Sequence, residues 1–326
     1  MKAVEVVEES GKPKPQLVEV ADPRPARGEV LVDVQATALN HADLLQIRGQ
    51  YPPPAGESTV PGLECSGLIA ELGAGVSGFL PGDRVMALLG GGGHASRVAI
   101  PVGQLMALPD RLSFAEGAAL PEACLTAWTN LVHEGGLRPG ETVLVTGATG
   151  GMGTMAVEIA NQLGARVLAA GRDRGRLENL RGLGADGYVL LDETLTAEAL
   201  ALTGGRGVDL IFDLVGGRFL PDLIRSLAVG GRLTQVGLLA GRSAQLELYD
   251  LMSRRARLIG SVLRPRSRTE KAALVRGFAA FGLPRLADGR LRPVVDRIMP
   301  FERIIEAYGV LAAGGVSGKI VLTLES

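Results

Sequence analysis

The sequence is poor in the side chains that bind metals or form disulfides. Its 326 residues include two cysteines, Cys65 and Cys124, and no C-x-x-C pair occurs. Two cysteines are too few for a disulfide framework and are typical of a reducing compartment. The three histidines, at 41, 94 and 133, are too scattered to form an obvious metal site, so each is better explained as a packing or surface residue.

The sequence also lacks an excess of charge of one sign and any long apolar run. Lys plus Arg is 34 and Asp plus Glu is 35, for a net charge of -1, so no overall basic field would attract nucleic acid. The apolar runs are the length of strands, far below the roughly 20 residues of a membrane helix. The N-terminus MKAVEVVEES has acidic residues where a signal peptide is apolar. We expect a cytoplasmic protein without a membrane span.

The first third of the chain has the pattern of short strands. Turn-forming clusters such as DPRPARGE and GAGVSGFLPGD separate apolar stretches at residues 30–34, 67–72, 84–88 and 94–100. This spacing predicts a compact β-rich domain.

From about residue 141 the pattern changes to alternating strands and helices. Strands are expected at 142–146, 166–170, 208–214 and 231–236, and helices at 151–163, 173–183, 195–203 and 218–228. Such alternation predicts a doubly wound parallel sheet of the Rossmann type. A further strand at 257–262 could extend the sheet.

The tail does not repeat this alternation. It contains expected helices at 269–281 and 301–312 and a last strand at 319–324, which we assign back to the first domain. The nucleotide-binding domain is then an insertion. The expected domains are 1–121, 122–264 and 265–326.

Residues 143–153, VLVTGATGGMG, have the order strand, glycine turn, helix. Gly150 lets the backbone approach a pyrophosphate, and Gly153 lets the helix pack closely on the strand. The helix N-terminus offers free N–H groups to phosphate. The predicted contacts are Thr149, Gly150, Gly151 and Met152, and the alternative is a tight turn that binds nothing.

The end of the second strand of this unit predicts which nucleotide binds. An acidic residue there would hold the ribose 2′-hydroxyl of NAD, but the position is Gly171, and Arg172, Arg174 and Arg176 follow. A guanidinium matches the geometry of a 2′-phosphate, which favours NADPH. The alternative is a solvated helix start with Asp173 as its N-cap.

The chain resembles a known family, the zinc-free medium-chain dehydrogenases/reductases of the quinone oxidoreductase group. It is most similar to the subgroup of the tumour-suppressor-inducible quinone oxidoreductase, with zeta-crystallin more distant. The resemblance runs nearly end to end. It is carried by ALNHADLLQIRGQYPPP (38–54), PGLECSG (61–67), PGDRVMALLGGGGHAS (81–96), ALPEACLTAW (119–128), LVTGATGGMGT (144–154), GADG (184–187), GSVLRPRS (260–267) and SGKIVL (317–322).

The resemblance implies a GroES-like β-rich domain, built from both ends of the chain, with the Rossmann domain inserted in it. Zinc-dependent relatives hold their catalytic metal with Cys at the position of Asn40, His at Leu63, and Cys or Asp near Glu122. Since Asn is a poor zinc ligand and Leu is none, no metal is expected.

The family pattern also implies residues near the nicotinamide and the acceptor. Asn40 and Thr126 would contact the cofactor, and Asn40, Tyr51 and Thr126 are the expected catalytic contacts. Tyr51 could instead pack in its loop, and Asp43 is better explained as a helix cap.

Further cofactor contacts are implied around the nucleotide. Arg176 matches the basic residue beside the 2′-phosphate, and Lys319 matches the one near the pyrophosphate, with a surface lysine as the alternative. Arg264 would reach the adenine-phosphate end. Residues at the ends of later strands, where ligands lie in doubly wound sheets, are Gly216, Val236 and Gly237.

The chain departs from the family at three positions. Leu191 stands where many relatives have a Tyr near the 2′-phosphate, and Arg172 stands where Ser is usual. His94 stands where Tyr is commoner, which puts the shape of the acceptor site in doubt.

The expected function is an NADPH-dependent, zinc-independent quinone reductase that transfers hydride in the cleft between the domains. The alternative acceptors are α,β-unsaturated carbonyls or enoyl thioesters. A non-catalytic or RNA-binding protein is a third hypothesis, which the balanced charge disfavours. The strand at 257–262 would lie at the sheet edge, so we expect a homodimer or homotetramer.

Overall fold

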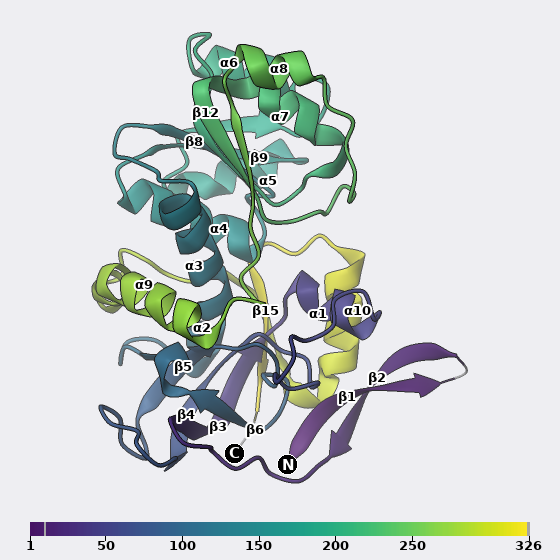
Figure 1. Ribbon diagram of the computed structural model, residues 1–326, viewed down its shortest axis with the longest axis vertical. Helices are drawn as coiled ribbons and strands as arrows, with labels where there is room; N and C mark the ends of the chain where they lie inside the picture. Colours follow the sequence, from purple (N-terminus) through teal and green to yellow (C-terminus); the bar gives the residue numbers. More distant parts are fainter. Residues whose placement is uncertain (10, 325–326) are drawn as a thin grey trace. The chain divides into compact units, whose positions relative to one another are not determined.

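The computed structural model describes residues 1–9 and 11–324, which form two compact units (Figure 1). Unit 1 comprises Met1–Leu125 and Leu263–Ser326, and unit 2 comprises Thr126–Val262. These limits lie close to the expected domain limits. Residues 10, 325 and 326, which the expected domains 1–121 and 265–326 include, lie outside the described residues.

Unit 2 is built on one parallel sheet of six strands in the order β10-β9-β8-β11-β12-β13. The chain starts in the middle at β8, runs out to β10, and then returns to build β11, β12 and β13 on the other side. Because crossovers between parallel strands are right-handed, the helices of the two halves cover opposite faces of the sheet. The predicted doubly wound sheet is therefore confirmed. Its elements are β8 (Thr142–Thr146), α4 (Gly151–Gln162), β9 (Arg166–Gly171), α5 (Arg174–Glu178), β10 (Gly187–Leu190), α6 (Leu195–Leu202), β11 (Val208–Asp213), α7 (Leu220–Ser226), β12 (Leu227–Gln235), α8 (Leu248–Ser253) and β13 (Arg257–Gly260).

Three local expectations for unit 2 need correction. The helix expected at 218–228 ends at Ser226, because Leu227 already belongs to β12. The helix expected at 173–183 is α5 followed by a 3₁₀ turn, Asn179–Leu183. The short strand β10 was not expected, because its four residues are too few to show a period.

Unit 1 has a seven-stranded sheet and a separate hairpin of β1 (Lys2–Glu9) and β2 (Lys12–Glu19). The main path is β14-β15-β3-β4-β5-β7, and β6 pairs with β3. Its elements are β3 (Glu29–Ala38), α1 (His41–Ile47), β4 (Glu64–Leu72), β5 (Arg84–Leu88), β6 (Arg97–Pro101), β7 (Leu105–Ala107), α2 (Phe114–Ala118), α9 (Arg268–Asp288), β14 (Val295–Pro300), α10 (Ile304–Ala313) and β15 (Lys319–Thr323); α3 (Pro121–Trp128) crosses the limit between the units.

The C-terminal tail completes the sheet of unit 1, as the sequence predicts. Strand β15 pairs antiparallel with β3, so that Val321 lies opposite Ala38 (Figure 1). The helix expected at 269–281 is longer, Arg268–Asp288. It begins with a capping box of Ser267 and Glu270 and ends at Gly289, which has the left-handed φ of 83°. Within the described residues no helix has the length and apolar character needed to cross a bilayer.

Candidate functional site

The turn between β8 and α4 leaves the start of the helix without a side-chain cap. Gly147 has a φ of 61°, and Gly150 is the N-cap of α4 without a side-chain cap. A Cβ at Gly153 would lie 2.3 Å from the Gly147 carbonyl oxygen, so the helix can pack this closely only with glycine there. At Gly150 the nearest atom to an added Cβ is 3.5 Å away, so packing does not require glycine at that position. Glycine there keeps the helix end open, which fits a pyrophosphate.

The predicted contacts in this turn lie at its surface. Thr149, Gly150, Gly151 and Met152 are each half-buried, while Ala148 is fully buried. The N–H groups of the first turn of α4 therefore face accessible space.

The end of β9 presents one arginine that is free for a ligand. Gly171 is buried, and Arg172 is exposed and has no hydrogen bond or ion pair within the part of the chain that the structure describes. Arg174 pairs with Glu198 at 2.5 Å and is thereby occupied. Of these two arginines, Arg172 is the one whose guanidinium is not paired with a carboxylate of the described residues.

Asp173 caps the helix that follows β9. Its Oδ1 accepts a hydrogen bond of 3.1 Å from the backbone N–H of Arg176, which confirms that it is the N-cap of α5. Arg176 is half-buried in that helix.

The ends of β11 and β12 are held by Asp213, a residue that sequence reasoning missed. Fully buried Asp213 accepts a 2.6 Å hydrogen bond from the hydroxyl of Thr146 and a 3.0 Å hydrogen bond from the N–H of Gly216. The N–H groups of Val236 and Gly237 donate to the Asp213 carbonyl oxygen at 2.9 and 3.1 Å. The available signal was a carboxylate directly at the end of the apolar strand VDLIFD.

The structure therefore brings Gly216, Val236 and Gly237 to the carboxyl ends of neighbouring parallel strands. The turn of β8 and α4 lies at the same edge, where doubly wound sheets bind their ligands. Thr126, in α3, is 3% exposed, and its carbonyl oxygen accepts a 2.9 Å hydrogen bond from Asn130.

In unit 1, Asn40 lies between β3 and α1 in a network of buried polar groups. Its Oδ1 accepts a 2.7 Å hydrogen bond from the ammonium of Lys319, and its Nδ2 donates a 2.9 Å hydrogen bond to Glu64 Oε1. An ammonium can only donate and a carboxylate only accepts, so these two partners determine the orientation of the amide. The carboxamide keeps one N–H for another acceptor.

Glu64 is the centre of this network, and sequence reasoning did not single it out. It is fully buried, and its carboxylate also contacts the Lys319 ammonium and accepts a 2.9 Å hydrogen bond from the N–H of Glu122. The signal was one acid within the apolar run LECSGLIA. Lys319 is 5% exposed and so is not a surface lysine. Its predicted contact with the pyrophosphate stays a prediction.

Asp43 is a structural residue. Its Oδ2 accepts a 2.7 Å hydrogen bond from the N–H of Asn40, and its Oδ1 accepts a 3.2 Å hydrogen bond from the N–H of Gly62. It thereby fixes the start of α1, which confirms the interpretation as a helix cap.

His94 is buried beside Asp43. Its Nδ1 lies 2.6 Å from the hydroxyl of Tyr308, and burial lowers the pKa of His94.

Tyr51 lies in the loop after α1, half-buried, with its hydroxyl making no hydrogen bond inside the described ranges 1–9 and 11–324. Burial, and secondly the charge of Glu122, raise the pKa of Tyr51. The guanidinium of Arg264 lies 5.1 Å from the centre of its ring. Arg264 therefore belongs to unit 1, and its predicted contact with the adenine-phosphate end stays a prediction.

The positions at which relatives bind zinc hold other groups here. Leu63 is 1% exposed and offers no donor atom, and Asn40 is already bonded to an ammonium. The residues that the structure describes contain no group of three or more His, Cys, Asp or Glu side chains that could hold a metal ion.

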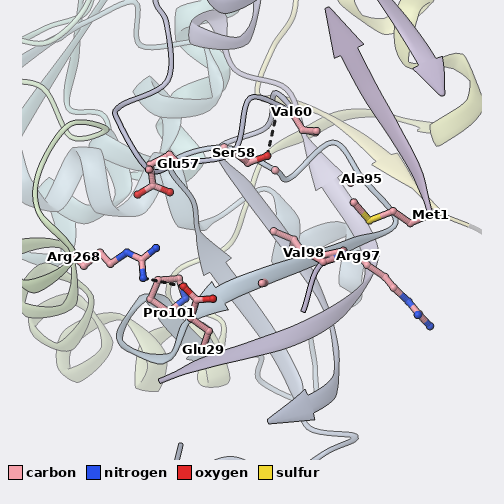
Figure 2. A pocket seen from close by; sticks show the side chains of 15 residues that line it. Met1, Glu29, Glu57, Ser58, Val60, Ala95, Arg97, Val98, Pro101 and Arg268 are labelled. Carbon is pink, nitrogen blue, oxygen red and sulfur yellow. Dashed lines mark hydrogen bonds and ion pairs between the residues drawn. The ribbon is translucent and has the colours of Figure 1, made fainter. Parts of the chain in front are cut away.

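A pocket of about 220 Å³ in unit 1 lies apart from these residues. Figure 2 shows Glu29, Glu57, Arg97 and Arg268 among its lining side chains. Arg268 pairs with Glu29 at 2.8 Å, and Arg97 pairs with Asp33 at 2.8 Å. Within the part of the chain that the structure describes, both guanidinium groups therefore already have carboxylate partners.

Comparison with known proteins assigns both units. Residues 26–110 match the family described as alcohol dehydrogenase GroES-like domain, and residues 151–276 match the family described as zinc-binding dehydrogenase. The expected fold class, a Rossmann sheet inserted into a GroES-like β-rich domain, is confirmed.

Similar proteins cover nearly the whole chain. Quinone oxidoreductase-like protein 2 of Bos taurus is 32% identical, covering 96% of this chain and 90% of its own. Acryloyl-coenzyme A reductase of Metallosphaera sedula is 33% identical, covering 94% and 95%. Among solved structures, the quinone oxidoreductase of Thermus thermophilus, solved also in complex with NADPH, is 36% identical with a TM-score of 0.82, covering 99% and 100%.

Proposed function

The chain belongs to the quinone oxidoreductase group of the medium-chain dehydrogenases/reductases, and within that family of oxidoreductases we propose that it is an NADPH-dependent quinone reductase. The observation that carries this proposal is the end of β9, where the acid expected of an NAD-binding protein is absent and exposed Arg172 stands without a partner among the described residues. The NADPH complex of the Thermus relative supports the same cofactor.

The residues of unit 2 fit such a nucleotide, which supplies a hydride when bound. The N–H groups at the start of α4, from Thr149 to Met152, would hold the pyrophosphate. Arg172, with Arg176 and Gly171 beside it, would hold the 2′-phosphate. Gly216, Val236 and Gly237 would line the nicotinamide half, together with Thr126.

The residues of unit 1 would orient the acceptor. The remaining N–H of Asn40 is held in one direction by Lys319 and Glu64, so it can donate to an oxygen of the acceptor or of the nicotinamide amide. The Tyr51 hydroxyl is protonated at neutral pH, all the more so because burial raises its pKa, and it can donate to a quinone oxygen. No step requires a metal, since Asn40 and Leu63 replace the usual ligands. Lys319 remains a candidate cofactor contact.

The test is steady-state oxidation of NADPH and of NADH with a panel of ortho- and para-quinones. The proposal expects turnover of at least one quinone with a clear preference for NADPH. Equal KM values for the two nucleotides would overturn the cofactor part, and no oxidation with any quinone would overturn the acceptor part.

A second candidate is a reductase of α,β-unsaturated carbonyls or enoyl thioesters. It is supported by the 33% identity to an acryloyl-coenzyme A reductase over 94% of this chain. Such an acceptor would receive the hydride at carbon and would use the same oxygen-binding groups. Faster turnover of an enone or enoyl thioester than of any quinone would favour this candidate.

We further propose a cytoplasmic homodimer or homotetramer that pairs through β13. This edge strand exposes Leu258 to 45%, and Val262 just after it is 55% exposed. In α8, Tyr249 and Met252 are 75% and 71% exposed. Exposed apolar side chains at an unpaired sheet edge favour pairing with a second copy.

A further inference from the structure

Arg264 is a buried cation whose hydrogen bonds all go to uncharged groups. It is 3% exposed, and its Nε, Nη1 and Nη2 donate to Gly90 O at 2.8 Å, Tyr51 O at 3.1 Å and Gln46 Oε1 at 2.6 Å. Across residues 1–9 and 11–324, no carboxylate lies within ion-pair distance of it. Burial of a cation that no carboxylate contacts is unfavourable. A role in packing alone therefore does not explain why an arginine occupies position 264.

The three partners of Arg264 come from three segments around the Tyr51 loop, residues 48–63. Gln46 lies in the last turn of α1, and its Nε2 donates a 2.8 Å hydrogen bond to the carbonyl oxygen of Thr59 at the far end of the loop. Arg264 and Gln46 thus connect the first and last parts of the loop. The cation also lies over the Tyr51 ring, 5.1 Å from its centre.

The far end of the Tyr51 loop has further anchors in residues 90–93. The N–H of Gly92 donates to Val60 O at 2.7 Å, and a Cβ at Gly90 would lie 2.3 Å from the carboxyl carbon of Glu57. The run of four glycines at 90–93 therefore packs directly against this end. Among the described residues, the hydrogen bond that Tyr51 makes is the one that its carbonyl oxygen accepts from Arg264.

We propose that Arg264 is the positioning residue that holds Tyr51 toward the acceptor, and not a ligand of the adenine-phosphate end of the cofactor. Its Nη1 fixes the Tyr51 backbone through the carbonyl oxygen, and the guanidinium over the ring fixes the direction of the ring. This inference rests on the proposed function, in which the Tyr51 hydroxyl contacts the acceptor.

The kinetic test compares Arg264→Met, Arg264→Lys, Tyr51→Phe and the double variant Arg264→Met with Tyr51→Phe. We expect Arg264→Met to lower kcat/KM for the quinone about tenfold, while the Kd for NADPH changes by less than about twofold. The double variant should have the same kcat/KM as the less active of the two single variants, because both changes remove the contact of Tyr51 with the acceptor. Arg303→Met, which removes an exposed arginine of unit 1, is the matched control.

The opposite kinetic result would overturn the proposal. If Arg264→Met raises the Kd for NADPH about tenfold, and its effect multiplies with that of Tyr51→Phe, Arg264 acts on the cofactor independently of Tyr51. Arg264→Lys keeps the charge without the fork and should recover little of the loss. Full recovery by lysine would show that charge alone matters.

A second measurement needs neither cofactor nor acceptor. Amide hydrogen exchange of the free protein should be about tenfold faster at the hydrogen-bonded amides of Gly49, Gln50 and Glu57 in Arg264→Met than in wild type, and unchanged in Arg303→Met. Gln46→Leu, which removes one partner only, should give a smaller increase and serves if Arg264→Met folds poorly. Unchanged exchange in both variants refutes the positioning role. If exchange is faster but the protein reduces no quinone or enone, Arg264 positions the loop and the proposed function is wrong.

Discussion

The ammonium nitrogen of Lys319 lies 2.7 Å from the carboxamide oxygen of Asn40, although 279 residues separate them in the sequence. The pairing of β15 with β3 brings them together, since Lys319 begins β15 and Asn40 follows the end of β3. The same ammonium neutralises buried Glu64. The direction of the Asn40 amide therefore depends on the last strand of the chain.

Replacing Lys319 by Met should destabilise the protein and weaken catalysis together. It leaves the Glu64 carboxylate buried without a cation, which typically costs about 3–5 kcal/mol of unfolding free energy. Urea unfolding and kcat/KM for a quinone measure both effects, and Lys319→Arg should recover part of each. Lys2→Met, which removes an exposed ion pair with Glu302, is the control and should unfold like wild type. Equal stability of the Lys319 and Lys2 variants would contradict the buried network.

Two glycines of the β8–α4 turn should respond differently to alanine. Gly153→Ala places a Cβ 2.3 Å from the Gly147 carbonyl oxygen, so it should lower the unfolding free energy by about 1–3 kcal/mol. Gly150→Ala has room within the protein but would fill the space in front of the helix. We expect it to keep its Tm and to bind NADPH more weakly, as calorimetry can measure. The reverse pattern would mean that the turn holds no nucleotide.

Arg172→Ser should change the KM for NADPH and leave the KM for NADH unchanged. Loss of a charge-assisted hydrogen bond to the 2′-phosphate should raise the KM for NADPH about tenfold or more, with no change for NADH. Arg174→Ser is the matched control, because Arg174 already pairs with Glu198 and should matter little. A larger rise in the KM for NADPH in the Arg174 variant would show that Arg174, and not Arg172, contacts the phosphate.

The stability of the protein should fall as the pH drops below about 6.5. Burial lowers the pKa of His94 below its ordinary value of 6.5, so the unfolded chain binds this proton more readily than the folded chain. The contribution of His94 is complete above that pH and is lost as the pH falls, with a slope of at most about 1.4 kcal/mol per pH unit. Urea unfolding between about pH 7.5 and pH 5.5 measures the slope. His94→Gln should flatten it, and an unchanged slope would exclude His94 as its source.

A charge on the edge strand should break the proposed assembly. Leu258→Glu places a carboxylate on exposed β13, where a second copy would bring the same charge opposite it. Light scattering after size exclusion should show a smaller particle than for wild type. Leu80→Glu is the control, because Leu80 is 68% exposed in a turn of unit 1 and lies in no strand. A wild-type monomer, or an unaffected Leu258 variant, would refute pairing through β13.

Much of unit 2 could be predicted from the sequence, because its signals are local. The period of the apolar residues predicts its main strands and helices, and VLVTGATGGMG carries the strand, turn and helix of the phosphate site within eleven consecutive positions. The glycine at 171 and the three arginines after it likewise lie within six consecutive positions. The strand β10 was missed because four residues do not establish a period.

The contacts of unit 1 could not be predicted in the same way. Lys319 appears as an ordinary basic residue beside a strand until β15 pairs with β3, and Glu64 gains its partners only from that pairing and from α3. Arg264 finds acceptors in three segments that lie more than a hundred residues upstream. Local geometry follows from neighbouring residues, whereas a buried charge can be satisfied only by groups that the tertiary fold brings to it. The sequence therefore determined where a nucleotide can bind, and only the folded structure decided how the side chains of unit 1 are oriented around Asn40 and Tyr51.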